Sequence, residues 1–488
     1  MSRQAPPERE PPARLLSGRG ANGLNFRLLL ALASLALALV AGCGGEDPEA
    51  HVVIVTTSDV MGKTSPCGCH TPKGGLARRA TFLDSVRAGR RRVVVVDAGG
   101  FFPAIDDERE AGPFMLRAMA TLGTQAAGVG ANELRFGYAF VRESARSVGV
   151  PLVCANLLRT DGGAPAFEAW RVLEAGPVKV GVFGLVSETA DLGPTRDSLR
   201  VTGAEEAARR AVPALRSAGA GVIVLLSQLG KAAGDSLAAH VPGIDLVVAG
   251  GGVPVLPSGM PVGGGMALYG GMQGWQVGVA DVRLDGRGAL GDIAAHTVVL
   301  GPEVRTQPAM AASVKAFEDS LNAHLRAREV AFGPGPAPGG KGDHFVGMST
   351  CIRCHAREYA QWQTTAHARA WKTLVDLHKE STPECVPCHV TGRSSPGGFR
   401  TAEDATRLGN VQCEACHGMG TRHRDWAERG NEVAGGTCRG CHTEATSPTF
   451  TLAEYRPHVL HTPPAGLKPL PETPAQRLMR EGKRPGAH

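Results

Sequence analysis

Aromatic side chains and long apolar segments are both scarce in this sequence. Only 5% of its 488 residues are aromatic, whereas 43% are hydrophobic and 20% are charged. Such proportions are typical of a folded globular protein and exclude a disordered chain. The apolar run at residues 28–41 has fourteen residues, which is too short for a helix that spans a membrane comfortably. The length allows two or three domains.

A large excess of one charge is also missing. The formal net charge is +6, and residues 1–42 contribute +3 of it through five arginines and two glutamates. The remaining +3 gives no indication of nucleic-acid binding. We therefore expect no nucleic-acid partner.

The first 50 residues have the pattern of an exported lipoprotein. A basic segment precedes the apolar run, as in a secretory signal peptide. The run ends in Leu-Val-Ala-Gly-Cys, which resembles the cleavage box of bacterial lipoproteins and implies acylation of Cys43. We expect a signal peptide at 1–42, a tether at 43–50 and a lipid anchor on the periplasmic side of a bacterial membrane. Gly44 favours the outer membrane. A signal peptide cut elsewhere and an uncleaved anchor are the alternatives.

Eight of the twelve cysteines form four copies of Cys-x-x-Cys-His near the C-terminus. In this motif two thiols can form thioethers with one haem, and the histidine binds its iron. Two zinc ribbons would also use Cys-x-x-Cys pairs, but they give no reason for a histidine after each pair. We therefore predict four c-type haems with iron. The attachment residues are Cys351, Cys354, His355, Cys385, Cys388, His389, Cys413, Cys416, His417, Cys438, Cys441 and His442.

Upstream of the motifs, strand-like and helical segments alternate. Continuous apolar runs such as 52–57 and 222–227 are typical of buried strands, whereas 76–86 and 204–218 have helical spacing. This alternation predicts an α/β sandwich with helices on both faces of packed sheets. Segments 266–269 and 275–284 are expected to be antiparallel strands that close the domain.

Composition divides the rest of the chain. A Gly/Pro-rich segment separates the α/β region from the motifs, and the C-terminus is rich in proline and charge. We expect a mostly helical or irregular multihaem cytochrome c domain after the α/β region. The predicted boundaries are 51–300 for the α/β domain, 301–342 for a helix and linker, 343–462 for the haem domain and 463–488 for a disordered tail.

Four short segments of the α/β region have distinctive sequences. They are Thr57-Ser-Asp-Val-Met-Gly62, Gly74-Gly-Leu-Ala-Arg-Arg79, Asp97-Ala-Gly-Gly-Phe-Phe102 and Gly130-Ala-Asn-Glu-Leu-Arg-Phe-Gly137. With them the region resembles the 5′-nucleotidase family of metallophosphoesterases. That family uses Asp, Asn and His ligands to hold two metal ions that activate water and stabilise the leaving oxygen. The resemblance implies a metallophosphoesterase-like sandwich for 51–300.

Most of the family's ligand positions hold other residues here. Asp59 is kept, but the thioether of Met61 is a poor partner for the hard metals of such a site. Residues 51–300 contain four histidines in all, so a shifted alignment cannot restore a dinuclear centre. We expect no phosphoester hydrolysis. The other replacements are Gly100, Ala131, Asn132, Gln228, Gly251 and Val253.

Three cysteines remain outside the haem motifs and the lipoprotein box. Cys67 and Cys69 follow the first strand, near the former metal site. Cysteines two apart can close a small, strained and easily reduced ring. They are candidates for a redox dithiol, and the alternatives are a structural disulfide or two idle thiols. Cys154 lies in an apolar run and is expected in the core.

The haem region resembles the tetrahaem cytochrome c-554 family. Phe345-Val-Gly347, Trp362-Gln-Thr-Thr-Ala-His-Ala368 and Val411-Gln-Cys-Glu-Ala-Cys-His-Gly418 carry the resemblance. It implies that His367 and His423 are sixth iron ligands and that His458 or His461 serves a third haem. It also implies that the haem on the second motif lacks a protein sixth ligand, unless His378 takes that place.

Together these features predict a lipid-anchored periplasmic multihaem cytochrome that transfers electrons. The nucleotidase-like domain would be a scaffold or a thiol redox site, with no catalytic residues for hydrolysis. Expected partners are redox proteins or small-molecule electron donors and acceptors. One alternative is a working phosphoesterase fused to a cytochrome. The other is a haem enzyme that reduces a small nitrogen or sulfur oxide at an open iron.

Overall fold

The structure is a computed structural model that describes most of the chain after the first 50 residues. The predicted signal peptide, Cys43, the tether, Cys69 and the Gly/Pro linker at 332–341 lie outside the described residues. None of the described helices combines the length and the apolar character needed to cross a membrane. The described ranges are 51–67, 70–90, 92–104, 108–285, 288–331, 342–393, 395–429, 433–444 and 446–481.

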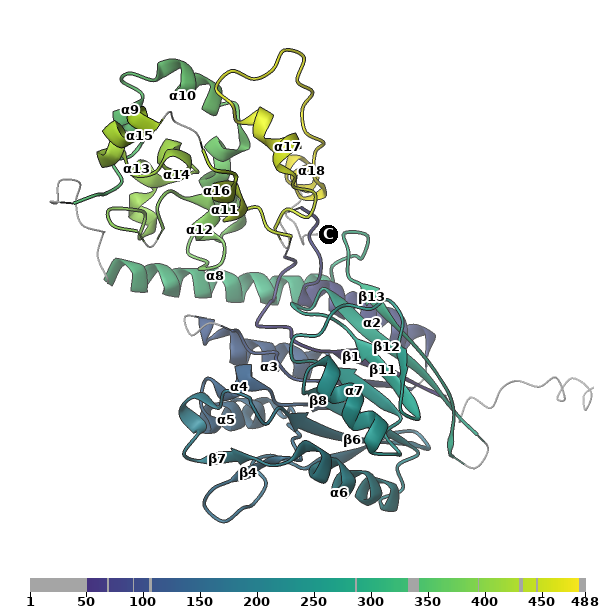
Figure 1. The fold of residues 1–488 in the computed structure, drawn as a ribbon. Coiled ribbons are helices and arrows are strands. Elements are labelled where there is room, and N and C mark those ends of the chain that lie inside the picture. Colours follow the sequence, from purple (N-terminus) through teal and green to yellow (C-terminus); the bar gives the residue numbers. More distant parts are fainter. Residues whose placement is uncertain are drawn as a thin grey trace, which may run out of the picture. The chain divides into compact units, whose positions relative to one another are not determined.

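Two sheets form the centre of the N-terminal domain (Figure 1). In the first sheet β1, β2 and β3 are parallel, and β12 and β13 extend it in antiparallel fashion. Its order is β13 (Leu290–Val299), β12 (Gln276–Leu284), β1 (His51–Thr57), β2 (Val93–Asp97), β3 (Ala126–Ala127). The second runs β10 (Met260–Val262), β11 (Gly265–Tyr269), β9 (Leu246–Ala249), β8 (Val222–Gln228), β6 (Val178–Val186), β5 (Trp170–Ala175). A small separate sheet pairs β4 (Leu157–Arg159) with β7 (Leu199–Val201).

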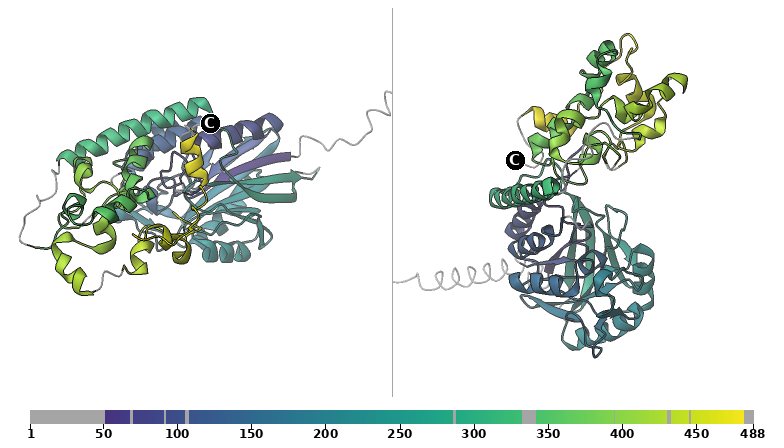
Figure 2. Two further views of the ribbon diagram at one scale, coloured as in Figure 1. Left: turned by 90° about the horizontal axis from the view of Figure 1, so that it is seen from above. Right: turned by 90° about the vertical axis from the view of Figure 1, so that its left-hand side faces the viewer.

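Helices cover the outer face of each sheet, so the domain has four layers. Apolar side chains such as Ile54 and Val224 fill the space between the sheets. A second core joins the first sheet to α2 (Leu76–Gly89), α3 (Ala111–Thr121) and α5 (Tyr138–Val148). A third joins the second sheet to α6 (Ala204–Ser217) and α7 (Lys231–His240). The short helix α4 (Ala131–Leu134) follows β3. Figure 2 shows these layers from two further directions, and they confirm the predicted α/β sandwich.

One strand differs from its predicted pairing. β11 pairs in parallel with β9 and in antiparallel fashion only with the short edge strand β10. Its pleated apolar pattern suits either direction, because both kinds of ladder bury alternate side chains in the same way. The direction is set by the connection from β9 through β10, which the apolar pattern does not encode.

The long helix α8 (Pro308–Ala331) packs on this domain. Met310 and Val314 belong to the same core as α2, and the rings of Phe114 and Phe317 stack with centroids 4.1 Å apart. The packed unit therefore continues beyond residue 300.

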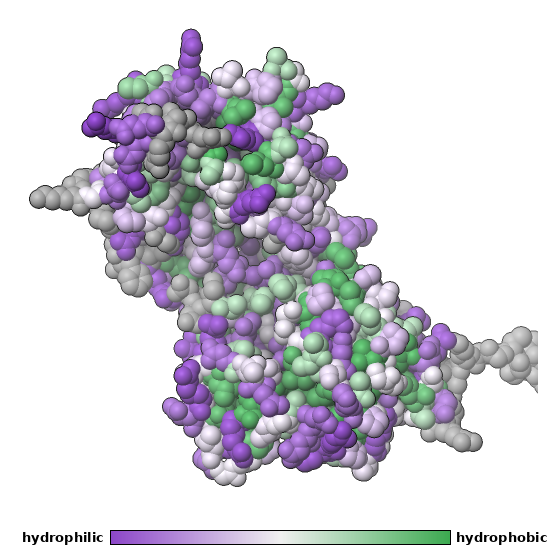
Figure 3. Space-filling model, viewed as in Figure 1, coloured by the Kyte–Doolittle hydropathy of each residue, from purple (hydrophilic) through white to green (hydrophobic). Residues whose placement is uncertain are grey.

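The C-terminal domain consists of short helices joined by irregular segments, as predicted. Its apolar core is small and contains Phe345, Leu374, Val386, Val390, Phe399 and Leu408. Figure 3 shows apolar residues in small, separate groups among hydrophilic ones on the visible face of the molecule. The helices are α9 (Met348–Cys351), α10 (Ala356–Trp362), α11 (Ala370–Leu377), α12 (Val386–His389), α13 (Ala405–Leu408), α14 (Cys413–His417), α15 (His423–Arg429), α16 (Gly435–Arg439) and α17 (Leu452–Tyr455).

The tail expected to be disordered contains a helix, α18 (Pro474–Arg480). Thr473 accepts a hydrogen bond from the backbone N–H of Gln476, and Ala475 and Leu478 are buried. The proline at the first helical position and this cap favour the helix. Proline content alone was therefore a poor guide to this segment.

Candidate functional site: a closed strand edge and paired imidazoles

The strand edge at which the 5′-nucleotidase family holds its metal ligands lies at the carboxyl ends of the parallel strands of the N-terminal domain. Asp59 follows β1, Asp97 ends β2 and Gln228 ends β8, so the two packed sheets bring these side chains together. Asp97 is held by the hydroxyl of Thr57 and by the backbone N–H of Gly99. Burial raises the pKa of Asp97 to about 6.

The amide of Gln228 occupies the centre of this edge. Its Nε2 donates to Asp59 Oδ1 over 3.1 Å, and the backbone N–H of Gly252 donates to Asp59 Oδ2 over 3.0 Å. A Cβ atom added at Gly130 would lie 2.6 Å from the Gln228 side-chain oxygen, and one at Gly250 would lie 2.3 Å from its nitrogen. The amide therefore fills space that the neighbouring glycines leave open.

A dinuclear metal centre does not fit these residues. A Cβ atom at Gly100, which replaces a family ligand, would lie 2.3 Å from Asp59 Oδ1. Asn132 donates to the carbonyl oxygen of Phe102, and burial raises the pKa of Asp59 above its ordinary value. Among the described residues, no group of three or more His, Cys, Asp and Glu side chains is arranged to hold a metal ion.

The Cys67 thiol is connected to this edge by hydrogen bonds. The indole of Trp275 donates to Cys67 Sγ over 2.6 Å, and the thiol donates to Gln273 Oε1 over 3.2 Å. The backbone N–H of Gln273 in turn donates to the carbonyl oxygen of Asp59. Burial raises the pKa of the Cys67 thiol. Cys154 is fully buried, as predicted for a core residue.

In the C-terminal domain, three motif histidines each face a histidine that was predicted as a sixth iron ligand. The ring centroids of His355 and His423 are 6.0 Å apart, those of His367 and His442 are 6.2 Å apart, and those of His417 and His461 are 6.1 Å apart. Two imidazoles on opposite faces of one iron have centres roughly 6 Å apart, because two metal–nitrogen bonds of about 2 Å each add to the distance from each nitrogen to its ring centre. Each pair therefore leaves room for one iron between its rings.

The protonation of these rings suits iron binding. Burial lowers the pKa of His367 and that of His442 below their usual value. A neutral imidazole is the form that binds a metal. His461 lies opposite His417 of the third motif. No ring contact joins His458 to a motif histidine among the described residues, and its carbonyl oxygen accepts a hydrogen bond from Gln361.

The second motif is different. His389 directs Nδ1 to the carbonyl oxygen of Ala370 over 2.6 Å, which leaves Nε2 for iron. No second imidazole lies in ring contact with His389 in the described part of the chain. His378 is an exposed residue at the end of α11, in a left-handed conformation with φ of 55°. His344 is half-buried, and its Nδ1 lies 2.8 Å from the carbonyl oxygen of Gly342.

The motif cysteines indicate which motifs are neighbours. Cys351 of the first motif is in hydrogen-bond contact with Cys413 of the third. Cys388 of the second motif is in the same kind of contact with Cys441 of the fourth. Burial raises the pKa of the Cys416 thiol to about 11, and nearby Cys438 adds to the shift. The motifs are therefore adjacent in the order first, third, fourth, second.

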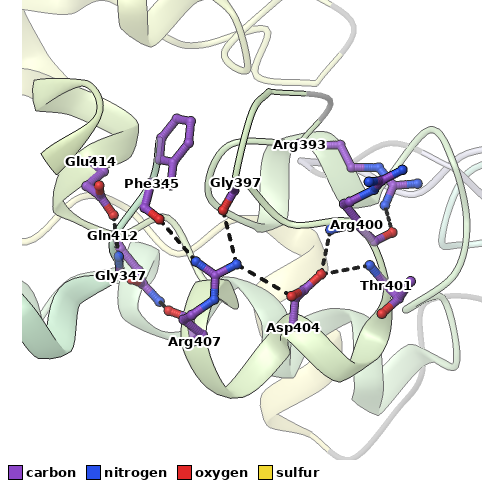
Figure 4. Close-up of polar contacts among 10 residues, drawn as sticks. All are labelled: Phe345, Gly347, Arg393, Gly397, Arg400, Thr401, Asp404, Arg407, Gln412 and Glu414. Carbon is purple, nitrogen blue, oxygen red and sulfur yellow. Dashed lines mark hydrogen bonds and ion pairs between the residues drawn. The ribbon is translucent and has the colours of Figure 1, made fainter. Parts of the chain in front are cut away.

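Buried polar contacts hold the loops around these motifs (Figure 4). Glu414 accepts a hydrogen bond from the backbone N–H of Gly347 over 2.7 Å. It accepts another from the backbone N–H of Val346 over 2.9 Å. Arg407 donates to the carbonyl oxygens of Phe345 and Gly397. The indole of Trp362 donates to the carbonyl oxygen of Val411 over 2.8 Å. These side chains hold the irregular segments between the short helices in place.

Comparison with known proteins agrees with both halves of this description. Residues 350–418 match the family model of cytochrome c554 and c-prime. Over 95 residues the chain is 34% identical to cytochrome c-554 of Nitrosomonas europaea, covering 16% of this chain and 40% of that protein. Over 298 residues it is 24% identical to the snake venom 5′-nucleotidase of Naja atra, covering 56% of each.

A solved structure supports the fold of the N-terminal domain. The 5′-nucleotidase precursor from Thermus thermophilus superposes with a TM-score of 0.50 at 23% identity, covering 56% of this chain and 59% of that one. The chain is thus a fusion of a 5′-nucleotidase-like domain with a cytochrome c554-like domain. It spans about half the length or less of the two curated relatives.

Two features of the site had no signal in the sequence. Gln228 was identified only as the replacement of a ligand, and its role in closing the strand edge depends on glycines from three separate loops. The contacts of Gln273 and Trp275 with Cys67 join residues more than 200 positions apart. Neither residue belongs to a recognisable motif.

Proposed function

We propose that this protein is a lipid-anchored electron carrier on the periplasmic side of a bacterial membrane, with four covalently bound haems. The observation that carries the proposal is the spacing of roughly 6 Å in three imidazole pairs, each containing one motif histidine. The family match over residues 350–418 supports c-type haem with iron.

A haem iron, when bound, accepts and releases one electron. The residues of this chain fix the position of that iron, since cysteines attach the ring and histidines approach it from one or both faces. Paired histidine ligation lowers the reduction potential relative to Met/His ligation. The adjacency of the motifs gives an order of first, third, fourth and second for electron transfer.

The proposal assigns no phosphoesterase activity to the N-terminal domain. Support comes from Gln228, whose amide bridges Asp59 where the family holds metal, and from the glycines packed around it. The domain then serves as a scaffold for the haem domain and for Cys67.

Cys67, with Cys69, is proposed as a thiol redox site. Lys63 of the same loop forms an ion pair with Glu384, which directly precedes Cys385 of the second motif. Lys379 is also close enough to lower the pKa of the Cys67 thiol and to interact with Cys385. Substitution of both cysteines by serine should slow haem reduction by sulfide, and an unchanged rate would remove this role.

A second candidate function is reduction of a small nitrogen or sulfur oxide at the second motif. It is favoured by His389, which lacks the facing imidazole seen at the other three motifs among the described residues. The substrate would bind at the free face of that iron.

A redox titration followed by electron paramagnetic resonance tests the proposal. We expect four one-electron equivalents, with three low-spin signals and one high-spin signal from the second motif. A high-spin signal that shifts when nitrite or nitric oxide is added would favour the second candidate. Fewer than four equivalents would contradict the carrier proposal.

A further inference from the structure

A half-open hollow of about 340 Å³ lies beside α11 and contains none of the cysteines or histidines of the four motifs. This volume is in the range of small-molecule sites. The apolar part of its wall comes from Trp371, Val375 and Ala402, and the polar part from Arg326, Glu380, Thr401 and Glu403.

Two buried polar atoms in this wall lack partners. Glu380 is 7% exposed and Thr401 is 3% exposed. One carboxylate oxygen of Glu380 pairs with Arg326, whereas Oε2 has no hydrogen-bond partner among the described residues, and neither has Thr401 Oγ1. Buried polar groups in folded proteins are nearly always satisfied, so an unpaired acceptor and an unpaired hydroxyl in one hollow point to a ligand.

The chemistry of the wall selects the class of ligand. The unpaired Glu380 oxygen requires a donor, while Thr401 Oγ1 can donate or accept. Arg326 already balances the charge of Glu380, and Glu403 disfavours an anion. The indole of Trp371 favours a flat, apolar body. A neutral aromatic diol meets all of these requirements.

We propose that this hollow binds a hydroquinone-type aromatic diol that donates electrons to the haem domain. The electron-donating part rests on the proposed function. Trp371 directly follows Ala370, whose carbonyl oxygen contacts His389 of the second motif. Oxidation of one diol to its quinone breaks two O–H bonds and releases two electrons and two protons. The electrons reduce two ferric haems, and the protons pass by way of Glu380 to water.

The first test measures binding to the oxidised holoprotein by calorimetry. The probe is 1,3-dihydroxynaphthalene, a meta-diol that has no simple quinone form. Glu380→Gln replaces the unpaired carboxylate oxygen with an amide NH2 group, which cannot accept a hydrogen bond from the O–H of the ligand. This variant should weaken binding about 10- to 100-fold. Thr401→Val should weaken it about 3- to 10-fold. Asp376→Asn, an exposed carboxylate change on α11, should leave binding unchanged. No binding to the wild type, or equal binding by all variants, would overturn the site.

The second test mixes oxidised holoprotein with the hydroquinone menadiol without oxygen and follows the haem absorbance. We expect reduction that slows in Glu380→Gln in parallel with the loss of binding, while dithionite reduces the wild type and both variants equally. Binding without reduction by menadiol would overturn the donor role. Failure of dithionite to reduce the wild type would instead contradict the proposed electron carrier. The haem spectrum of each variant shows whether it is folded.

Discussion

The two domains of this protein differ in whether the side chains at their sites contact one another or leave space for a bound group. In the N-terminal domain, the side chains at the strand ends contact one another directly, since Gln228 donates a hydrogen bond to Asp59. In the C-terminal domain, imidazoles remain about 6 Å apart with room between them. The first arrangement is complete without a cofactor, whereas the second is complete only with one.

Their interiors differ in the same way. The N-terminal domain has three extensive apolar cores made by its own strands and helices. Among the described residues, the C-terminal core contains six buried apolar side chains. Hydrophobic burial scales with the area removed from water, so we expect the C-terminal domain to depend on the apolar surface of bound haems for its stability. The contrast shows how the two kinds of site differ in one chain. Direct hydrogen bonds fill the strand edge of the N-terminal domain, whereas the paired imidazoles of the C-terminal domain leave a space between them.

The largest expected effect is on the C-terminal domain when haem attachment is blocked. Replacing Cys413 and Cys416 by serine removes one attachment site at the centre of the motif order. We expect rapid proteolysis of residues beyond 342, while the N-terminal domain survives as a stable fragment. Limited proteolysis with mass spectrometry measures this. Cys67→Ser serves as control, and equal resistance of both proteins would contradict the contrast.

The next effect concerns a single iron ligand. His461→Ala removes the imidazole that faces His417 and should convert one low-spin haem to a high-spin one with a raised reduction potential. His458→Ala, three residues earlier, should leave the spectrum unchanged. Electron paramagnetic resonance of the two variants shows which of the two histidines is the iron ligand. A high-spin signal in His458→Ala alone would show that the pairing is misassigned.

A smaller effect follows from the buried carboxyl of Asp97. Its pKa of about 6 exceeds the ordinary 3.8, so between these values the folded state binds more protons than the unfolded state. The contribution of Asp97 to the free energy of unfolding therefore falls as pH rises from about 4 to 6. Asp97→Asn cannot titrate. The wild type should lose up to about 3 kcal/mol relative to this variant across the window. Parallel denaturation curves at all pH values would contradict the prediction.

The smallest expected effect is that of added metal. Because Gln228 occupies the centre of the strand edge, Mn²⁺ or Zn²⁺ should neither raise the unfolding temperature of the N-terminal domain nor produce hydrolysis of 5′-AMP. A ligand that binds only the folded state must raise that temperature. Two bound metal ions by elemental analysis, together with turnover, would restore the phosphoesterase alternative.

Much of this organisation was predictable because its signals are local. The Cys-x-x-Cys-His spacing identifies attachment residues directly, and continuous apolar runs such as 222–227 identify buried strands. The pairing of His461 rather than His458 with His417 was left open, because both residues lie in the same short segment and only the folded backbone separates them. The sequence also did not predict the parallel pairing of β11, which depends on a chain connection. Nor did it predict the helix α18, which depends on a cap in a proline-rich segment.

The central claim is that the C-terminal domain is built around covalent haem. The intact mass of the full chain, produced in a host that matures c-type cytochromes, tests it most directly. The account predicts a coloured protein whose mass exceeds that of the processed polypeptide by four haems. A colourless protein, or one whose mass matches the polypeptide alone, would contradict it.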